Sequence, residues 1–207
     1  MPNILPVPFQ VYTKKMIILY PTETLYALGA NALDFEVLQK LYTLKGRDSE
    51  KVASWLVRNL DDVATYAEIS EAAKKIAQEF LPGSLTLVLK VKDFLADELV
   101  APDRTIGFRI SNDPITEKII ADFMQEFDAP LTCTSANVSG SPTFSVPGEI
   151  LQQFGQKAQM IEQIYDDGPR KGLASTVVRV VGDEVTVLRE GAISEADILQ
   201  CLKENQT

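Results

Sequence analysis

Two hydrophobic patterns alternate along this chain. Short continuous apolar runs, typical of buried strands, are separated by segments in which apolar residues recur every three or four positions, as on one face of a helix. The first run, 17–20, ends at Pro21, and Asp34 then stands where it can cap a helix. The expected strands are 17–20, 55–57, 85–91, 105–110, 131–134, 161–165, 175–181 and 184–189. The expected helices are 34–44, 70–80, 114–126 and 194–203.

This order of elements predicts an α/β fold. Strands that alternate with helices indicate a mixed parallel and antiparallel sheet with helices on its faces, and Gly182-Asp183 predicts a hairpin between the last two strands. With 207 residues, 45% of them hydrophobic, the chain can bury a full core. We find no repeat, low-complexity tract or linker, so we expect a single domain over residues 1–207.

Charge and residue usage narrow the possible chemistry. The formal net charge is −9, and because nucleic-acid binders neutralise phosphates, a general RNA-binding role is disfavoured unless a local basic cleft exists. The chain has no histidine, which excludes Ser-His-Asp hydrolysis, Cys-His catalysis and histidine metal sites. Catalysis would therefore depend on lysine, arginine, carboxylates, hydroxyls and a loosely held metal.

Cysteine usage and hydropathy indicate the cellular setting. Cys133 and Cys201 lie far apart and neither has a metal-ligand or redox spacing, so we expect reduced thiols. We find no apolar stretch near the length of a membrane span, and residues 1–15 do not have the order of a signal peptide. These features predict a soluble, cytoplasmic protein.

Three polar clusters, 21–29, 45–47 and 134–140, stand where a strand or helix is expected to end. Each alone is compatible with an ordinary turn, helix cap or Asx-rich loop. Their coincidence favours a ligand site at the edge of the sheet, because Arg109 also interrupts an apolar strand and needs an anionic partner. We expect the loops 21–26, 45–51 and 134–143 to line one cavity, with four cations pointing into it: Lys45, Arg47, Arg109 and Arg189. The common glycine-rich nucleotide loops are missing, so nucleotide binding would use scattered cations and hydroxyls.

Seven short motifs occur in order along the chain: Pro-Thr-Glu-Thr-x-Tyr-Ala-Leu-Gly (21–29), Lys-Gly-Arg (45–47), Pro-Gly-x-x-Thr (82–86), Gly-Phe-Arg (107–109), Thr-Ser-Ala-Asn-x-Ser-Gly (134–140), Ser-Thr-Val-Val (175–178) and Leu-Arg-Glu-Gly-Ala (188–192). In this order the chain resembles the YrdC/Sua5 family of threonylcarbamoyl-AMP synthases, over about residues 17–193. It looks like the compact, single-domain branch of that family.

The resemblance implies a twisted mixed sheet with a large concave cavity. It also implies an enzyme that makes L-threonylcarbamoyl-AMP from L-threonine, bicarbonate or CO2 and ATP, with release of pyrophosphate. Downstream threonylcarbamoyl transferase proteins would use the product for the t6A modification of ANN-decoding tRNA, and direct tRNA binding by this chain is not expected. Mg²⁺ would arrive with ATP, held mainly by phosphate and water, because we find no dedicated carboxylate cluster.

The resemblance also assigns roles to residues. Lys45 and Arg47 would be catalytic and would clamp the phosphates, arginine suiting a planar target and lysine a point charge. The implied ATP-binding set is Lys45, Arg47, Lys51, Thr105, Ser135, Ala136 through its backbone, Asn137, Thr143 and Arg189. The implied threonine-binding set is Thr24, Arg109, Thr134 and Ser175, with Arg109 on the carboxylate.

The sequence departs from the family at several positions. Asp48 stands where a proline is usual and brings a negative charge toward the phosphate site, while Ser54 and Trp55 replace aliphatic residues. Leu56 occupies a position where some longer members have a histidine that contacts threonine. Two alternatives therefore stay open. One is a non-synthase paralogue of the same fold that binds nucleotide, and the other is a double-stranded-RNA or tRNA binding module, against which the net charge argues.

Overall fold

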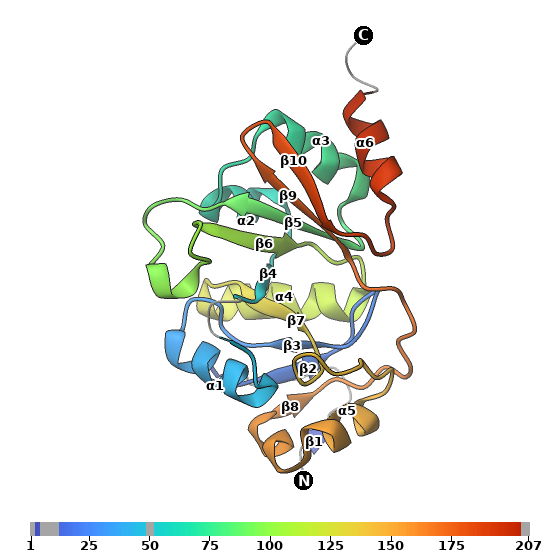
Figure 1. The fold of residues 1–207 in the computed structure, drawn as a ribbon. Helices are drawn as coiled ribbons and strands as arrows, with labels where there is room; N and C mark the ends of the chain where they lie inside the picture. Colours follow the sequence, from blue (N-terminus) through green and yellow to red (C-terminus); the bar gives the residue numbers. More distant parts are fainter. Residues whose placement is uncertain (1–2, 5–12, 49–51, 204–207) are drawn as a thin grey trace.

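The computed structural model describes residues 3–4, 13–48 and 52–203. Its strands form one mixed sheet in the order β1-β8-β2-β3-β7-β4-β6-β5-β9-β10 (Figure 1). The pairs β4/β6, β5/β9, β2/β8 and β1/β8 are parallel, and the others are antiparallel. The strands are β1 Asn3–Ile4, β2 Ile18–Tyr20, β3 Ala27–Gly29, β4 Ser54–Leu56, β5 Leu85–Lys90, β6 Thr105–Arg109, β7 Leu131–Ser135, β8 Gln163–Ile164, β9 Thr176–Val181 and β10 Glu184–Arg189.

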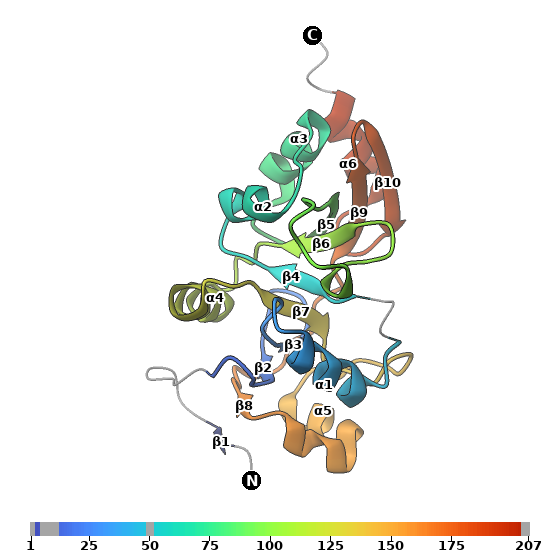
Figure 2. The ribbon, with the colours of Figure 1, turned by 90° about the vertical axis from the view of Figure 1, so that its left-hand side faces the viewer.

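Helices cover both faces of this sheet. The α-helices are α1 Phe35–Lys45, α2 Leu60–Tyr66, α3 Glu71–Phe80, α4 Pro114–Phe127, α5 Pro147–Phe154 and α6 Glu195–Lys203, with 3-10 turns η1 Asp97–Leu99 and η2 Gly155–Met160. Figure 2 shows α4 on one side of β3 and β7, and α1 with α5 on the other. None of the described helices is both long and apolar enough to cross a membrane.

The four expected helices are present, and α1 begins directly after its expected cap. The Asp34 side chain accepts from the Val37 N–H, and Gly46 ends α1 with a left-handed φ of 59°. Sequence reasoning missed α2, α5 and β3. The helix α2 has only seven residues, α5 begins inside the Ser/Gly/Pro-rich stretch, and β3 is three residues long, so each is shorter than the window of about 11–18 residues over which periodicity is read.

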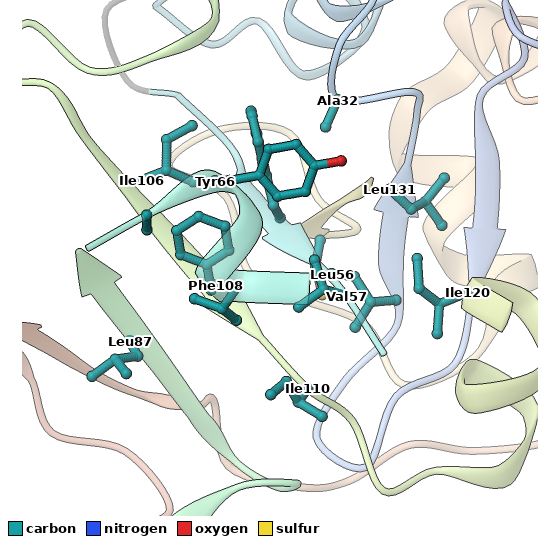
Figure 3. Close-up of a cluster of buried hydrophobic side chains, with 14 of the residues drawn as sticks. Ala32, Leu56, Val57, Tyr66, Leu87, Ile106, Phe108, Ile110, Ile120 and Leu131 are labelled. Carbon is teal, nitrogen blue, oxygen red and sulfur yellow. The ribbon is translucent and has the colours of Figure 1, made fainter. Parts of the chain in front are cut away.

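The apolar run at 17–20 is continuous because the sheet is covered on both faces. Ile18 and Tyr20 belong to the larger core cluster with α4, whereas Ile17 and Leu19 pack with residues of α1 and α5 in a second cluster. Part of the larger cluster, including Leu56, Phe108 and Leu131, is drawn in Figure 3. Both faces of the central strands are thus filled, and polar side chains gather where these strands end.

The strand register brings the three polar clusters together. Ala27 at the start of β3 pairs with Ser135 at the end of β7, and Ser54 at the start of β4 pairs with Cys133. The end of α1 is joined to the segment after β7, because the Ser139 N–H donates to the Lys45 carbonyl at 2.8 Å. Segments that are distant in sequence therefore meet at one end of the central strands.

Candidate functional site

Two adjoining pockets include residues of these segments. The inner pocket, of about 200 Å³, is lined by residues of 22–27, β4 to β7, β9 and Arg189. The outer pocket, of about 510 Å³, is lined by residues 45–48 together with Ser135, Asn137, Ser139 and Gly140. Arg47 and Ser135 line both. The large concave cavity that the resemblance implies stays a prediction, and two joined pockets are what the described residues form here.

Three arginines line the inner pocket: Arg47, Arg109 and Arg189. Burial, and then the charge of Arg109, lower the pKa of Arg189. Burial also lowers the pKa of Arg47. Because cations that crowd in a partly buried space repel one another, the pocket is suited to an anionic group that lies between them.

Arg109 has an anionic partner from within the chain. Its guanidinium is paired with Glu23, whose other carboxylate oxygen accepts from the Ser111 hydroxyl. Its Nη2 also donates to Thr24 Oγ1 at 3.3 Å, whereas its buried Nε has no hydrogen-bond partner among the described residues. The expected need of Arg109 for an anion is thus met in part by Glu23, and Nε remains as a donor for a further acceptor.

Hydroxyl groups line the same pocket in pairs. Thr22 and Thr24 share a hydrogen bond of 2.9 Å, and so do Thr86 and Ser175. Arg189 donates to the Ser175 carbonyl at 2.7 Å. The implied threonine-binding residues Thr24, Arg109, Thr134 and Ser175 all line the inner pocket.

The loop before β9 positions Thr24. The Gly172 N–H donates to the Thr24 carbonyl at 3.0 Å. A Cβ at position 172 would lie 2.6 Å from that carbonyl oxygen, closer than side-chain atoms approach. The contact therefore requires glycine at this point.

Lys45 is buried at the border of the outer pocket, with 2% of its surface exposed. Its Nζ donates to the main-chain oxygens of Ser135 and Asn137, the latter at 2.9 Å, and to Asn137 Oδ1 at 3.4 Å. Burial, and then the charge of Arg47, lower the pKa of Lys45 to about 7. Arg47 donates to Thr134 Oγ1 of β7 at 3.0 Å and to the Val52 carbonyl at 2.8 Å. These hydrogen bonds hold the guanidinium where the two pockets adjoin.

Most polar groups of the loop after β7 are bonded within the protein. We expected the backbone of Ala136 to contact ATP. Its N–H instead donates to the Tyr26 carbonyl at 2.9 Å. Asn137 Oδ1 accepts from the Ser135 hydroxyl, and Asn137 Nδ2 donates to the Ser141 carbonyl, both at 2.6 Å. Ser135 and Asn137 nevertheless line the outer pocket as expected.

Two expected ATP ligands, Thr105 and Thr143, line neither pocket. Thr105 lies at the start of β6, opposite Arg109 at its end, and its hydroxyl donates to Asp103 at 2.7 Å. A strand of five residues separates its two ends by about 13 Å, so Thr105 is distant from Arg109, and it lines neither pocket. Thr143 is exposed and also lines neither pocket. Lys51 lies outside the described residues.

Sequence reasoning missed other residues of the inner pocket and its supports. Ser54, Thr86 and Cys133 line it from strands that read as apolar, and Glu23 supports Arg109. The available signal was a small polar residue within each apolar run. Trp55 is core, with its ring 5.4 Å from that of Tyr66, so the bulky residue next to Ser54 does not enter the pocket.

The exposed Asp48 carboxylate lines the outer pocket. Among the described residues, no group of three or more cysteine, aspartate or glutamate side chains could hold a metal ion. Leu56 is fully buried, and because its side chain is apolar, this position offers no polar side-chain group to a ligand. The site can bind an anion in each pocket, with Arg47 between them.

Comparisons with known proteins show the family to which this chain belongs. The family model for the Sua5/YciO/YrdC domain, described as telomere recombination, matches residues 10–191. The chain belongs to this family. The predicted family is thus confirmed, and so is the α/β fold with a mixed sheet flanked by helices.

Two curated relatives have names that state the activity. A protein of Methanocaldococcus jannaschii, provisionally named threonylcarbamoyl-AMP synthase, is 35% identical over 89% of this chain and 84% of its own length. The threonylcarbamoyl-AMP synthase of Bacillus subtilis is 31% identical over 88% of this chain and 51% of its own length. The relatives thus have the activity name that the resemblance implied.

Two solved structures have the same fold. The Sua5 protein of P. abyssi, complexed with L-threonine, superposes with a TM-score of 0.81 and 29% identity, over 92% of this chain and 54% of that one. The E. coli YciO protein gives a TM-score of 0.76 and 26% identity, over 89% of this chain and 87% of its own. This chain spans about half the length of the Bacillus subtilis and P. abyssi proteins.

Proposed function

We propose that this protein makes L-threonylcarbamoyl-AMP from L-threonine, bicarbonate and ATP, with release of pyrophosphate. The observation that supports this most directly is the inner pocket, where the four residues implied for threonine meet. The P. abyssi relative of the same fold was solved with L-threonine. The names of the curated synthases add the reaction class.

The two pockets divide the substrates between them. The inner pocket takes the amino acid, with its carboxylate on Arg109 and the carbamate that forms on its amine directed toward Arg47, so that the carbamate oxygen reaches the α-phosphorus. The outer pocket takes the triphosphate, which faces Arg47 as well. Because the carbamate supplies the nucleophile, the protein contributes positioning and charge stabilisation, and a chain without histidine suffices.

Mg²⁺ fits this arrangement as a companion of ATP. The outer pocket offers one carboxylate, Asp48, and the hydroxyls of Ser135 and Ser139. A magnesium ion bound mainly by phosphates and water needs no more than this, and it would neutralise charge on the triphosphate. The chain's own part is to hold the phosphates through Arg47.

The product is a mixed anhydride that a downstream threonylcarbamoyl transferase would consume in making t6A on tRNA. We do not propose direct tRNA binding, because the net charge of −9 opposes it.

The test is pyrophosphate release from the purified chain. Incubation with ATP, L-threonine and bicarbonate should release pyrophosphate only when all three are present. Ser175→Ala, which removes a hydroxyl of the inner pocket, should raise the KM for threonine more than that for ATP. Lys118→Met, in an exposed ion pair on α4, is the matched control and should leave turnover unchanged. Release without threonine, or none at all, would contradict the proposal.

A non-synthase function remains as a second candidate because of two observations. Asp48 places a carboxylate in the outer pocket, and this chain covers 87% of YciO, for which the curated name states no activity. A paralogue of that kind should bind nucleotide in calorimetry yet release no pyrophosphate in the three-substrate assay.

A further inference from the structure

Lys45 is occupied by contacts within the protein. A lysine nitrogen donates three hydrogen bonds when charged and two when neutral. Three oxygens surround Nζ: the carbonyls of Ser135 and Asn137, and Asn137 Oδ1. In either protonation state, the donors of Lys45 are matched by acceptors of the loop 135–141.

The main chain of Lys45 holds the same loop. Its carbonyl accepts from the Ser139 N–H at 2.8 Å. Within the loop, Asn137 Nδ2 donates to the Ser141 carbonyl at 2.6 Å, and the Ser141 N–H donates to the Val138 carbonyl at 2.9 Å. Lys45 is thus hydrogen-bonded to the loop through both its side-chain Nζ and its main-chain carbonyl. Further hydrogen bonds connect residues within the loop.

Arg47 differs from Lys45 in its position. It lines both pockets, whereas Lys45 is buried and lines only the outer one. The lowered pKa of Lys45, about 7, also makes it an incomplete cation near neutral pH. A guanidinium stays charged and has five donors. Although Arg47 also donates to Thr134 and to the Val52 carbonyl, its position in both pockets makes it the better partner for a triphosphate.

We infer that Lys45 is a positioning residue, which holds the loop 135–141 in shape through its Nζ, while Arg47 meets the charge of the phosphates. The phosphate half of this inference rests on the proposed function. The loop half does not, since the contacts that carry it are present without any ligand.

The experiment uses two readouts on the full chain. Amide hydrogen exchange of residues 135–141, without ligand, reports on the loop. Calorimetric binding of inorganic pyrophosphate, the probe for the phosphate subsite, reports on charge. The variants are Lys45→Met, Lys45→Arg and Arg47→Met, and the matched control is Lys40→Met, an exposed lysine of the same helix.

Lys45→Met should raise amide exchange in 135–141 by ~10-fold or more, because buried carbonyls lose their donor. Its loss of pyrophosphate affinity should be smaller than that of Arg47→Met. Lys45→Arg keeps the positive charge, but the donors of a planar guanidinium do not match three acceptors that surround the position of a single nitrogen. Amide exchange in 135–141 should therefore rise in this variant too. Lys40→Met should change neither readout. If Lys45→Met does not fold, Lys45→Arg provides the same comparison.

Unchanged loop exchange in Lys45→Met would overturn the inference. So would a loss of pyrophosphate affinity equal to that of Arg47→Met, or full recovery of both readouts in Lys45→Arg. Failure of the proposed function has a different signature, which is a wild-type protein that does not release pyrophosphate from ATP while loop exchange still depends on Lys45.

Discussion

Removing Arg109 should damage this protein in two separable ways, because the residue pairs with Glu23 and also faces the inner pocket. The two side chains are 9% and 12% exposed, so the pair is largely shielded from water. Arg109→Met leaves the Glu23 carboxylate largely buried, with the Ser111 hydroxyl as its remaining side-chain partner among the described residues. We therefore expect losses of both folding stability and threonine binding.

The expected magnitudes follow from burial. Breaking a buried ion pair by removing one partner costs about 3–5 kcal/mol in the free energy of unfolding. The double variant Arg109→Met/Glu23→Gln removes both charges. Replacing a buried ion pair by uncharged residues often changes the free energy of unfolding little, so most of that loss should be recovered. Threonine binding should remain weaker by about 2–5 kcal/mol in both variants, because the carboxylate has lost its cation.

Urea unfolding gives the stability term, and calorimetric titration with L-threonine gives the binding term. ATP binding should be nearly unchanged in the double variant. The control is Lys118→Met, whose exposed partner Asp122 lies on the same helix, and which should cost no more than about 1 kcal/mol. If the double variant were as unstable as the single one, Glu23 would not be the stranded charge. Wild-type threonine affinity in either variant would refute the carboxylate assignment.

Three further predictions concern the phosphate side. Arg47→Lys should lower turnover by ~10²-fold or more, because lysine does not reproduce the two-pronged donor, and steady-state kinetics that match wild type would count against the clamp. Asp48→Asn should tighten ATP binding, most at low ionic strength and without Mg²⁺, and weaker ATP binding in calorimetry would contradict this. The pKa of Lys45 is lowered from 10.5 to about 7 in the folded protein, so between these pH values the unfolded chain binds one proton more than the folded one, and the stability contribution of Lys45 rises with pH. Denaturant unfolding of wild type and of Lys45→Met over this pH range should show the gain in wild type only. If wild type shows no gain, the folded Lys45 keeps its proton.

The fold was predictable where local chemistry and periodicity agree. The segment 34–44 has a capping aspartate, a helical period and a terminal glycine, and α1 forms there. The strand β3 was not predictable, because three residues carry no period of their own and its strand character comes from pairing with β2 and β7. Tertiary pairing, which the local sequence does not encode, decided that element.

The site was predictable as a set of loops but not as a set of contacts. Motif order grouped Thr24, Arg109 and Ser175, and all three line one pocket. It assigned Thr105 to the ATP set, but Thr105 lies at the opposite end of β6 from Arg109 and lines neither pocket. Glu23 was present in the first motif, yet its partner lies 86 positions away, and no local signal links the two.

The chain's acidity and its cationic pockets are compatible because charge is segregated. The net charge is −9, yet Lys45, Arg47, Arg109 and Arg189 line the two pockets, against Asp48 in the outer pocket and Glu23 behind Arg109. A cationic cleft with low-dielectric walls focuses its field on anions that enter it, whatever the average charge of the surface. The acidic remainder repels long polyanions such as tRNA, which must contact a broad surface, but it acts weakly beyond a screening length of about 8 Å on a small anion inside the cleft. The same distribution therefore favours small phosphate and carboxylate ligands and disfavours the RNA-binding alternative.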